Sequence, residues 1–110
     1  MSQKATPLLR IERVVIDPGS GEILGKLSVK IWSVPHDSRY PSGIKYSLQF
    51  ARWSGSGFDR NYLRYDNYCG HGDHKHIRGK RLPYRFTDVD TLIADFNSDA
   101  EKLLGFSLIP

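Results

Sequence analysis

The stretch T-D-V-D-T-L-I-A-D-F-N-S-D-A-E-K-L-L, residues Thr87–Leu104, decides the fold of this 110-residue chain. Its apolar residues recur at helical spacing, which is the pattern of a helix with one buried face. Thr87 and Asp90 resemble a capping box at its start, and Gly105 is a natural terminator after its last turn. We therefore predict one amphipathic helix over Thr87–Leu104. Its apolar stripe consists of Val89, Leu92, Ile93, Phe96, Ala100, Leu103 and Leu104.

The residues before this helix have the pattern of strands. Leu27, Val29 and Ile31 alternate with polar residues, so that a strand there would bury one side and leave the other in water. Similar alternation, β-branched residues and flanking turn residues mark further strands. The predicted strands are Leu8–Ile16, Lys26–Ile31, Ile44–Phe50, Phe58–Tyr68 and, as a short last strand ended by Gly79, His74–Ile77.

The helix needs an apolar surface to cover its stripe, and the only large one available is a face of the sheet. We therefore predict an α+β fold, in which an antiparallel sheet of four to five strands carries one C-terminal amphipathic helix on one face. At 110 residues the chain is expected to form a single domain. In this domain residues 1–6 are frayed, residues 8–77 are mainly strands, and residues 87–104 form the helix.

The composition is that of an ordinary globular chain, with 39% hydrophobic and 25% charged residues. No run approaches the roughly 18 apolar residues of a membrane span, and the N-terminus lacks the apolar segment of a signal peptide. We therefore expect a cytoplasmic protein that does not contact a membrane. Cys69 is the single cysteine, which excludes an internal disulfide. We expect no cofactor.

Charge is distributed unevenly along the chain, whose net charge is +4. Residues 60–85 contain seven Lys or Arg and two Asp, a local charge of +5, whereas residues 87–110 carry a local charge of −4. A basic region of this kind favours a polyanionic partner such as RNA. The alternative is that the basic and acidic regions pair with each other across the fold.

The chemistry-bearing residues gather in Tyr65–Phe86, Y-D-N-Y-C-G-H-G-D-H-K-H-I-R-G-K-R-L-P-Y-R-F. Three of the four histidines lie there, beside basic residues that could hold a phosphate. In a strand over His74–Ile77, His74 and His76 would project from one face and Lys75 from the other. His36 lies apart from them in a loop and is interpreted as an exposed bystander.

Two chemical interpretations fit this stretch. The first is a metal site, because His71, His74 and His76 with Asp66, Asp73 and Cys69 could supply nitrogen, oxygen and sulfur ligands. The neighbouring cations oppose it, because they would repel a metal ion, and we predict no metal.

The second interpretation is metal-independent cleavage of RNA, which needs a base, an acid and cations for the developing phosphorane charge. His74 and His76 could be base and acid, with Asp66 or Asp73 fixing an imidazole tautomer. The candidate catalytic residues are His71, His74, His76, Asp66 and Asp73. The candidates for holding phosphate or stacking on bases are Arg64, Lys75, Arg78, Lys80, Arg81, Tyr65 and Tyr84.

A histidine-rich turn without any chemistry remains the alternative, in which the side chains cap turns and the arginines are solvated. Cys69 beside His71 could also be a thiol nucleophile, although nothing in the sequence indicates a lowered thiol pKa. The enzyme and a binding module that engages RNA or an acidic protein without turnover therefore both stay open.

These motifs resemble the TumE-like toxin family. The resemblance rests on Y-D-N at Tyr65–Asn67, G-x-G-D-H-x-H at Gly70–His76, P-Y-x-F at Pro83–Phe86 and D-F at Asp95–Phe96. It implies a toxin of a toxin–antitoxin system, neutralised by a cognate antitoxin that is encoded beside it and carries a helix-turn-helix DNA-binding domain. RNA as the target is inferred from the His, Lys and Arg cluster, and a homodimer is left open.

Overall fold

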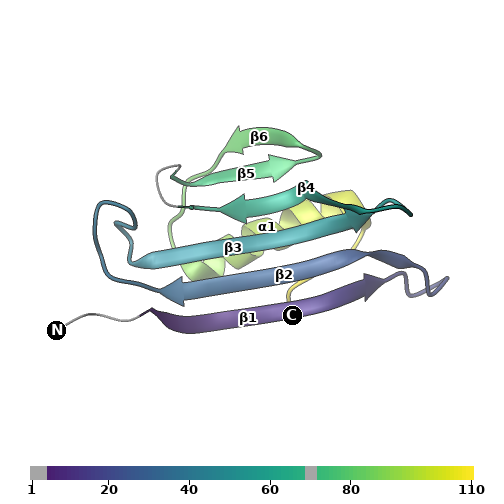
Figure 1. Ribbon diagram of the computed structural model, residues 1–110, viewed down its shortest axis with the longest axis horizontal. Coiled ribbons are helices and arrows are strands. Elements are labelled where there is room, and N and C mark those ends of the chain that lie inside the picture. The colour runs from purple at the N-terminus through teal and green to yellow at the C-terminus, as the bar shows by residue number, and fades with distance from the viewer. Residues whose placement is uncertain (1–4, 69–71) are drawn as a thin grey trace.

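The computed structural model describes residues 5–68 and 72–110. Among them, six strands form one sheet and are followed by one helix (Figure 1). The fold is therefore the predicted α+β arrangement, with six strands where four to five were expected. The elements are β1 (Thr6–Ile16), β2 (Ile23–Ser33), β3 (Ile44–Trp53), β4 (Phe58–Asp66), β5 (His74–Ile77), β6 (Lys80–Pro83) and α1 (Val89–Leu104).

The sheet is an antiparallel meander, in which the strands lie side by side in chain order from β1 to β6. Its first three strands are long and its last two short, as Figure 1 shows. Strand β1 begins at Thr6, two residues before the predicted start. Residues 1–4 of the segment expected to be frayed lie outside the described residues.

The sixth strand was missed because Gly79 was interpreted as the end of the sheet. Arg78 and Gly79 both have positive φ, 51° and 82°, between the paired residues Ile77 and Lys80. Two consecutive residues of this kind form the tight hairpin turn whose twist matches that of the flanking strands. Gly79 therefore reverses the chain into β6 and extends the sheet by one strand.

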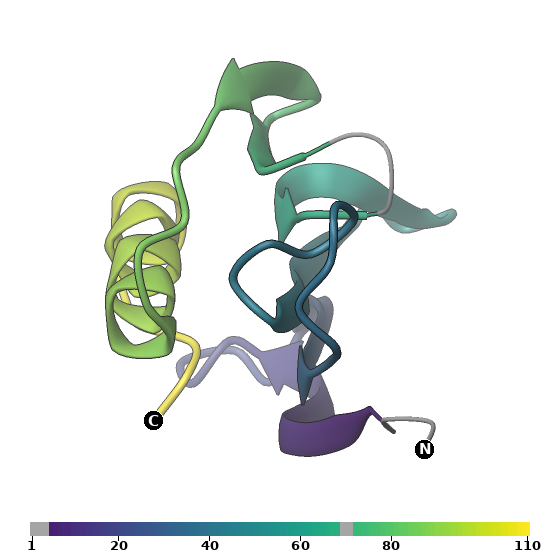
Figure 2. The ribbon, with the colours of Figure 1, turned by 90° about the vertical axis from the view of Figure 1, so that its left-hand side faces the viewer.

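The helix covers one face of the sheet, and the hydrophobic core lies between the two layers (Figure 2). Leu92, Phe96 and Ala100 on α1 are fully buried, which confirms the prediction that this stripe packs on the sheet. The alternation of β2, β3 and β4 supplies the facing surface. The sheet residues in this core include Leu27, Val29, Ile31, Tyr46, Leu48, Phe50, Leu63 and Tyr65.

Both ends of α1 have recognisable caps. The N-cap is Asp88, whose carboxylate accepts hydrogen bonds from the Thr91 backbone N–H at 2.7 Å and from the Thr91 hydroxyl at 3.1 Å. The predicted capping box at Thr87 and Asp90 is thus wrong by one residue, because the Asp88 carboxylate reaches the first turn directly. Gly105 ends the helix with φ 88°, as predicted.

Candidate functional site

The candidate site lies on the face of the sheet that the helix leaves uncovered, called here the open face. Side chains alternate across each strand, and directly opposed residues of neighbouring strands share a face. One cross-strand row of this face therefore runs Gln49–Arg64–His76–Arg81. The adjacent row runs Ser47–Asp66–His74–Pro83. The sheet thus brings together five of the candidate site residues, Arg64, Asp66, His74, His76 and Arg81.

Asp66 is the buried anion that organises this cluster. Its side chain is 7% exposed, and its Oδ2 accepts a hydrogen bond from Arg64 Nε at 2.5 Å. Its Oδ1 lies 3.2 Å from His74 Nε2 and accepts the Tyr68 backbone N–H at 3.2 Å. A buried carboxylate needs such partners, so Asp66 fixes the positions of both Arg64 and His74.

His74 is held at both of its ring nitrogens. Nε2 faces Asp66, and Nδ1 lies 3.1 Å from the Gly72 carbonyl oxygen. Since both neighbours are acceptors, a neutral ring can donate to only one of them, whereas a protonated ring can donate to both. The side chain is 6% exposed. His74 is therefore a fixed, enclosed residue that supports its neighbours.

His76 is more open and lies between two cations. Its ring meets the His74 ring edge-on, with centroids 5.2 Å apart. Burial, followed by the charge of Arg64, lowers the pKa of His76 below its ordinary value of 6.5, which favours the neutral ring. Within the described residues, its enclosed Nδ1 has no hydrogen-bond partner. Because Nδ1 is enclosed, a neutral His76 ring can take a proton from a substrate only at Nε2.

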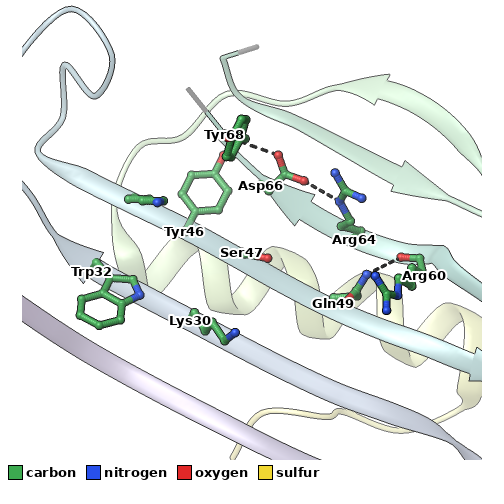
Figure 3. Close-up of a pocket in the computed structure, with 10 residues that line it drawn as sticks. Lys30, Trp32, Tyr46, Ser47, Gln49, Arg60, Arg64, Asp66 and Tyr68 are labelled. Atoms are coloured by element: carbon green, nitrogen blue, oxygen red, sulfur yellow. Dashed lines mark hydrogen bonds and ion pairs between the residues drawn. The ribbon is translucent and has the colours of Figure 1, made fainter. Parts of the chain in front are cut away.

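A groove of about 320 Å³ runs over the open face next to this cluster (Figure 3). Figure 3 shows Trp32 and Lys30 on one side of it and Arg64 and Arg60 on the other. Cations and aromatic rings on an exposed sheet are the surface that single-stranded nucleic acid uses. The groove is lined by Lys30, Trp32, Lys45, Tyr46, Ser47, Gln49, Arg60, Arg64, Asp66 and Tyr68.

Sequence reasoning missed the part of this groove that β2 and β3 provide. The signal was present, because Lys30 and Lys45 belong to the polar sets of two alternating strands. Extending the alternation of β2 by one step places Trp32 with Lys30. These residues lie far in the chain from the histidine-rich stretch, so no local motif links them to it.

Two predicted substrate-binding residues lie on the opposite, helix-covered face. Lys75 Nζ lies 3.0 Å from Asp99 Oδ2 on α1, with only 23% of the lysine side chain exposed. Tyr65 is fully buried, and its hydroxyl donates to the same Asp99 carboxylate. Burial, together with this bond, raises the pKa of the Tyr65 hydroxyl, so Tyr65 stays a donor. Neither side chain can reach a substrate on the open face.

Tyr84 and Asp73 are likewise engaged on the helix side. The Tyr84 hydroxyl donates to Asp95 Oδ2 at 2.7 Å, and its ring packs edge-on against Tyr65. Asp73 accepts the Tyr46 hydroxyl at 2.7 Å and the Phe86 backbone N–H at 3.3 Å. Asp73 therefore joins the end of the sheet to the segment before α1. Among the described residues, the ion pair between a carboxylate and a histidine joins Asp66 to His74.

The remaining candidates lie elsewhere. Arg78 occupies the turn between β5 and β6, and Lys80 follows it at the start of β6; both are exposed. His71 and Cys69, candidates for catalysis and for a thiol nucleophile, lie outside the described residues. In residues 5–68 and 72–110, no group of three or more His, Cys, Asp or Glu side chains is arranged to hold a metal ion.

The charge asymmetry is resolved in part by ion pairing. Lys75 pairs with Asp99 across the sheet–helix interface, as the pairing alternative proposed. Arg64 instead pairs with Asp66 on its own strand. The cations of the open face are thus separated from the acidic helix by the thickness of the sheet.

Within the described residues, no helix has the length and apolarity that crossing a membrane requires. Comparisons with curated proteins and with solved structures found no match. Residues 8–104 match the family model described as toxin TumE. The match extends the resemblance of the C-terminal motifs to β1 and covers the open face, the groove and α1. The chain therefore belongs to the TumE toxin family and is the toxin of a toxin–antitoxin system, with an antitoxin as its partner.

Proposed function

We propose that this toxin acts on RNA, which it binds along the open face and cleaves without a metal, using His76 as the general base. The observation that carries the proposal is the position of His76, a neutral imidazole between Arg64 and Arg81 beside a basic groove. Nucleophile activation and phosphate stabilisation would then operate at one place on the surface.

The reaction follows from these groups. His76 takes the proton of a ribose 2′-OH, and the 2′-oxygen attacks the adjacent phosphorus. The bond from phosphorus to the 5′-oxygen breaks, which leaves a 2′,3′-cyclic phosphate and a 5′-oxygen that takes a proton from water. The hydroxide so formed removes the proton from His76 and restores the neutral ring. Arg64 and Arg81 stabilise the negative charge that develops on the phosphorane.

His74 and Asp66 act in this scheme as positioning residues. The sequence suggested His74 as a second proton-transfer group, but its side chain is 6% exposed and both its ring nitrogens face acceptors. The His74 ring therefore supports the His76 ring, which it meets edge-on. Asp66 holds the side chain of Arg64, the residue directly opposite His76 on β4. An unsupported ring would sample other rotamers and lose rate.

The experiment compares His76→Ala with His36→Ala, a change of an exposed histidine in the loop before β3. Expressed without antitoxin, wild type and H36A should arrest growth, whereas H76A should not. Purified H76A should bind RNA nearly as well as wild type and produce no cyclic-phosphate ends. Cleavage by wild type should persist with a chelator and stop on RNA with a 2′-deoxy nucleotide at the cleaved position. A folded H76A variant that stays fully toxic and active would refute the role of His76.

A second candidate is a toxin that binds RNA without turnover, favoured by the groove and its exposed cations. Under this alternative, H76A stays toxic and wild type leaves RNA intact. Arg60→Ala would then relieve growth arrest, because the Arg60 side chain is exposed and lines the groove. The two candidates differ in whether RNA from arrested cells carries new ends.

The antitoxin is proposed to carry a helix-turn-helix DNA-binding domain, in keeping with the family resemblance.

A further inference from the structure

The two edges of the sheet differ in how they are protected. In the described part of the chain, β6 forms one edge with four residues, Lys80–Pro83, two of them cations and one a proline. Strand β1 forms the other edge with eleven residues, of which Leu8 is 52%, Val14 46% and Ile16 52% exposed. A short basic edge with a proline resists strand addition, whereas a long apolar one offers a template for it.

Strand β1 is also complementary to itself. Arg10 and Glu12 lie on the open face of β1, one on each side of Ile11. In the isolated chain Glu12 is only loosely paired, 3.7 Å from Lys30 Nζ and 3.9 Å from Arg10 Nη2, with all three side chains 45–65% exposed. These charges therefore remain available to a further strand.

We propose that β1 pairs antiparallel with β1 of a second copy of this chain, centred on Ile11. In this register Arg10 faces Glu12 of the second copy, and the reverse pair forms by symmetry. Leu8, which lies at the irregularity between Pro7 and Leu9, and Val14 are both exposed in the single chain and would come near each other at the two ends of the paired segment. Directly opposed side chains of opposite charge, or of apolar character, stabilise antiparallel pairs.

The neighbouring symmetric registers are unfavourable. Centring the pair on Arg10 would oppose two arginines, and centring it on Glu12 would oppose two carboxylates, both destabilising. The pairing of β1 with β2 is regular from Leu9 to Val15, so the central residues lie in an undistorted strand. Pro7, which lacks an N–H, falls near the end of the paired segment, where it is tolerated.

A symmetric contact of this kind is isologous, with a two-fold axis perpendicular to the sheet at Ile11. It would join the two sheets into one continuous sheet with both open faces on the same side and both helices on the other. The proposal does not depend on RNA cleavage. An antitoxin strand could occupy the same edge, but the self-matching order of charges favours a second copy.

The first experiment measures molar mass by light scattering and sedimentation from low to high micromolar protein. Wild type should dimerise. R10E or E12R alone should raise the dissociation constant about tenfold or more, because each makes two opposed pairs alike in charge. The double variant R10E/E12R should restore dimerisation, because it exchanges the charges in the same register. The control is R85E, which changes an exposed residue away from β1 by the same charge.

The second experiment fixes the register by cross-linking in a Cys69→Ser background, with copper phenanthroline as the oxidant. Ile11→Cys should form a covalent dimer, because residue 11 opposes itself at a distance that a disulfide can span. Arg13→Cys should not, because residue 13 opposes residue 9. Circular dichroism checks that each variant is folded. A wild type that is monomeric throughout, or a dimer that R10E and E12R leave unchanged, would overturn the proposal. The proposal would also be overturned if the β1 edge binds the antitoxin and does not bind a second copy of this chain.

Discussion

Lys75 offers the sharpest test of the distinction between basic residues that stabilise the fold and basic residues that can bind RNA on the open face. Replacing it by Ala removes the cation that faces Asp99, whose side chain is 11% exposed. Breaking a buried ion pair by removing one partner costs about 3–5 kcal/mol. Lys75 is 23% exposed, and Asp99 keeps the Tyr65 hydroxyl as a donor, so we expect the lower loss of about 2 kcal/mol in the free energy of unfolding. For a domain of this size the melting temperature should fall by about 8 °C.

The assay is urea unfolding followed by tryptophan fluorescence, with RNA affinity measured on the folded variant. K75A should lower the midpoint and leave RNA affinity unchanged. In a double-mutant cycle with D99N, the combined loss should be smaller than the sum of the single losses, because both changes remove the same pair. The reasoning is refuted if K75A unfolds at the wild-type midpoint yet binds RNA as weakly as a variant of the open face. That result would mean that Lys75 leaves Asp99 and reaches the substrate.

Three further predictions concern the core, the histidine and the groove. Phe96→Ala should cost about 3–5 kcal/mol in urea unfolding, because Phe96 is fully buried, and a loss below about 1 kcal/mol would contradict its central place in the core. Because the pKa of His76 is lowered in the folded protein, this histidine is protonated at a higher pH in the unfolded chain than in the folded one. The free energy of unfolding should therefore fall as the pH drops below 6.5. Unfolding of H76Q should show a weaker pH dependence just below pH 6.5, and an unchanged pH dependence would assign the effect to another group. Arg60→Ala should weaken RNA binding and reduce the slope of log affinity against log salt by about one, whereas an unaltered slope would place RNA elsewhere.

The helix shows how far local patterns reach in this protein. The spacing from Val89 to Leu104 predicted both the helix and its buried stripe, and the structure places Leu92 and Phe96 in the core. The N-cap was assigned one residue too early, because Thr87 and Asp88 are both acceptable caps and only the backbone geometry chooses between them. The sixth strand was missed for a similar reason. A glycine after a strand is compatible with the end of the sheet and with a hairpin turn, and only the pairing of Lys80–Pro83 with β5 distinguishes the two.

The candidate site was predicted in part. Period-two alternation placed His74 and His76 on one face, and the register adds Arg64, Asp66 and Arg81 to the same face. Lys75 was predicted to hold phosphate, whereas in the structure it pairs with Asp99. Alternation predicted that Lys75 lies on the face opposite the histidines. Whether a lysine on that face is solvated or pairs with an acidic residue depends on which element covers the face.

Local sequence was enough to define the helix, the alternation of the strands and the family motifs, because these depend on residues close together in the chain. The face of the sheet that the helix covers, and therefore the charges that stay in water, came only from the packed fold. Asp99, twenty-four residues beyond Lys75, accepts hydrogen bonds from Lys75 and Tyr65 and so holds both side chains between the sheet and the helix. Trp32, Lys30 and Arg60, remote in sequence from the histidines, join them on the open face. Long-range pairing sets burial, and burial decides whether a side chain stabilises the fold or can meet a substrate.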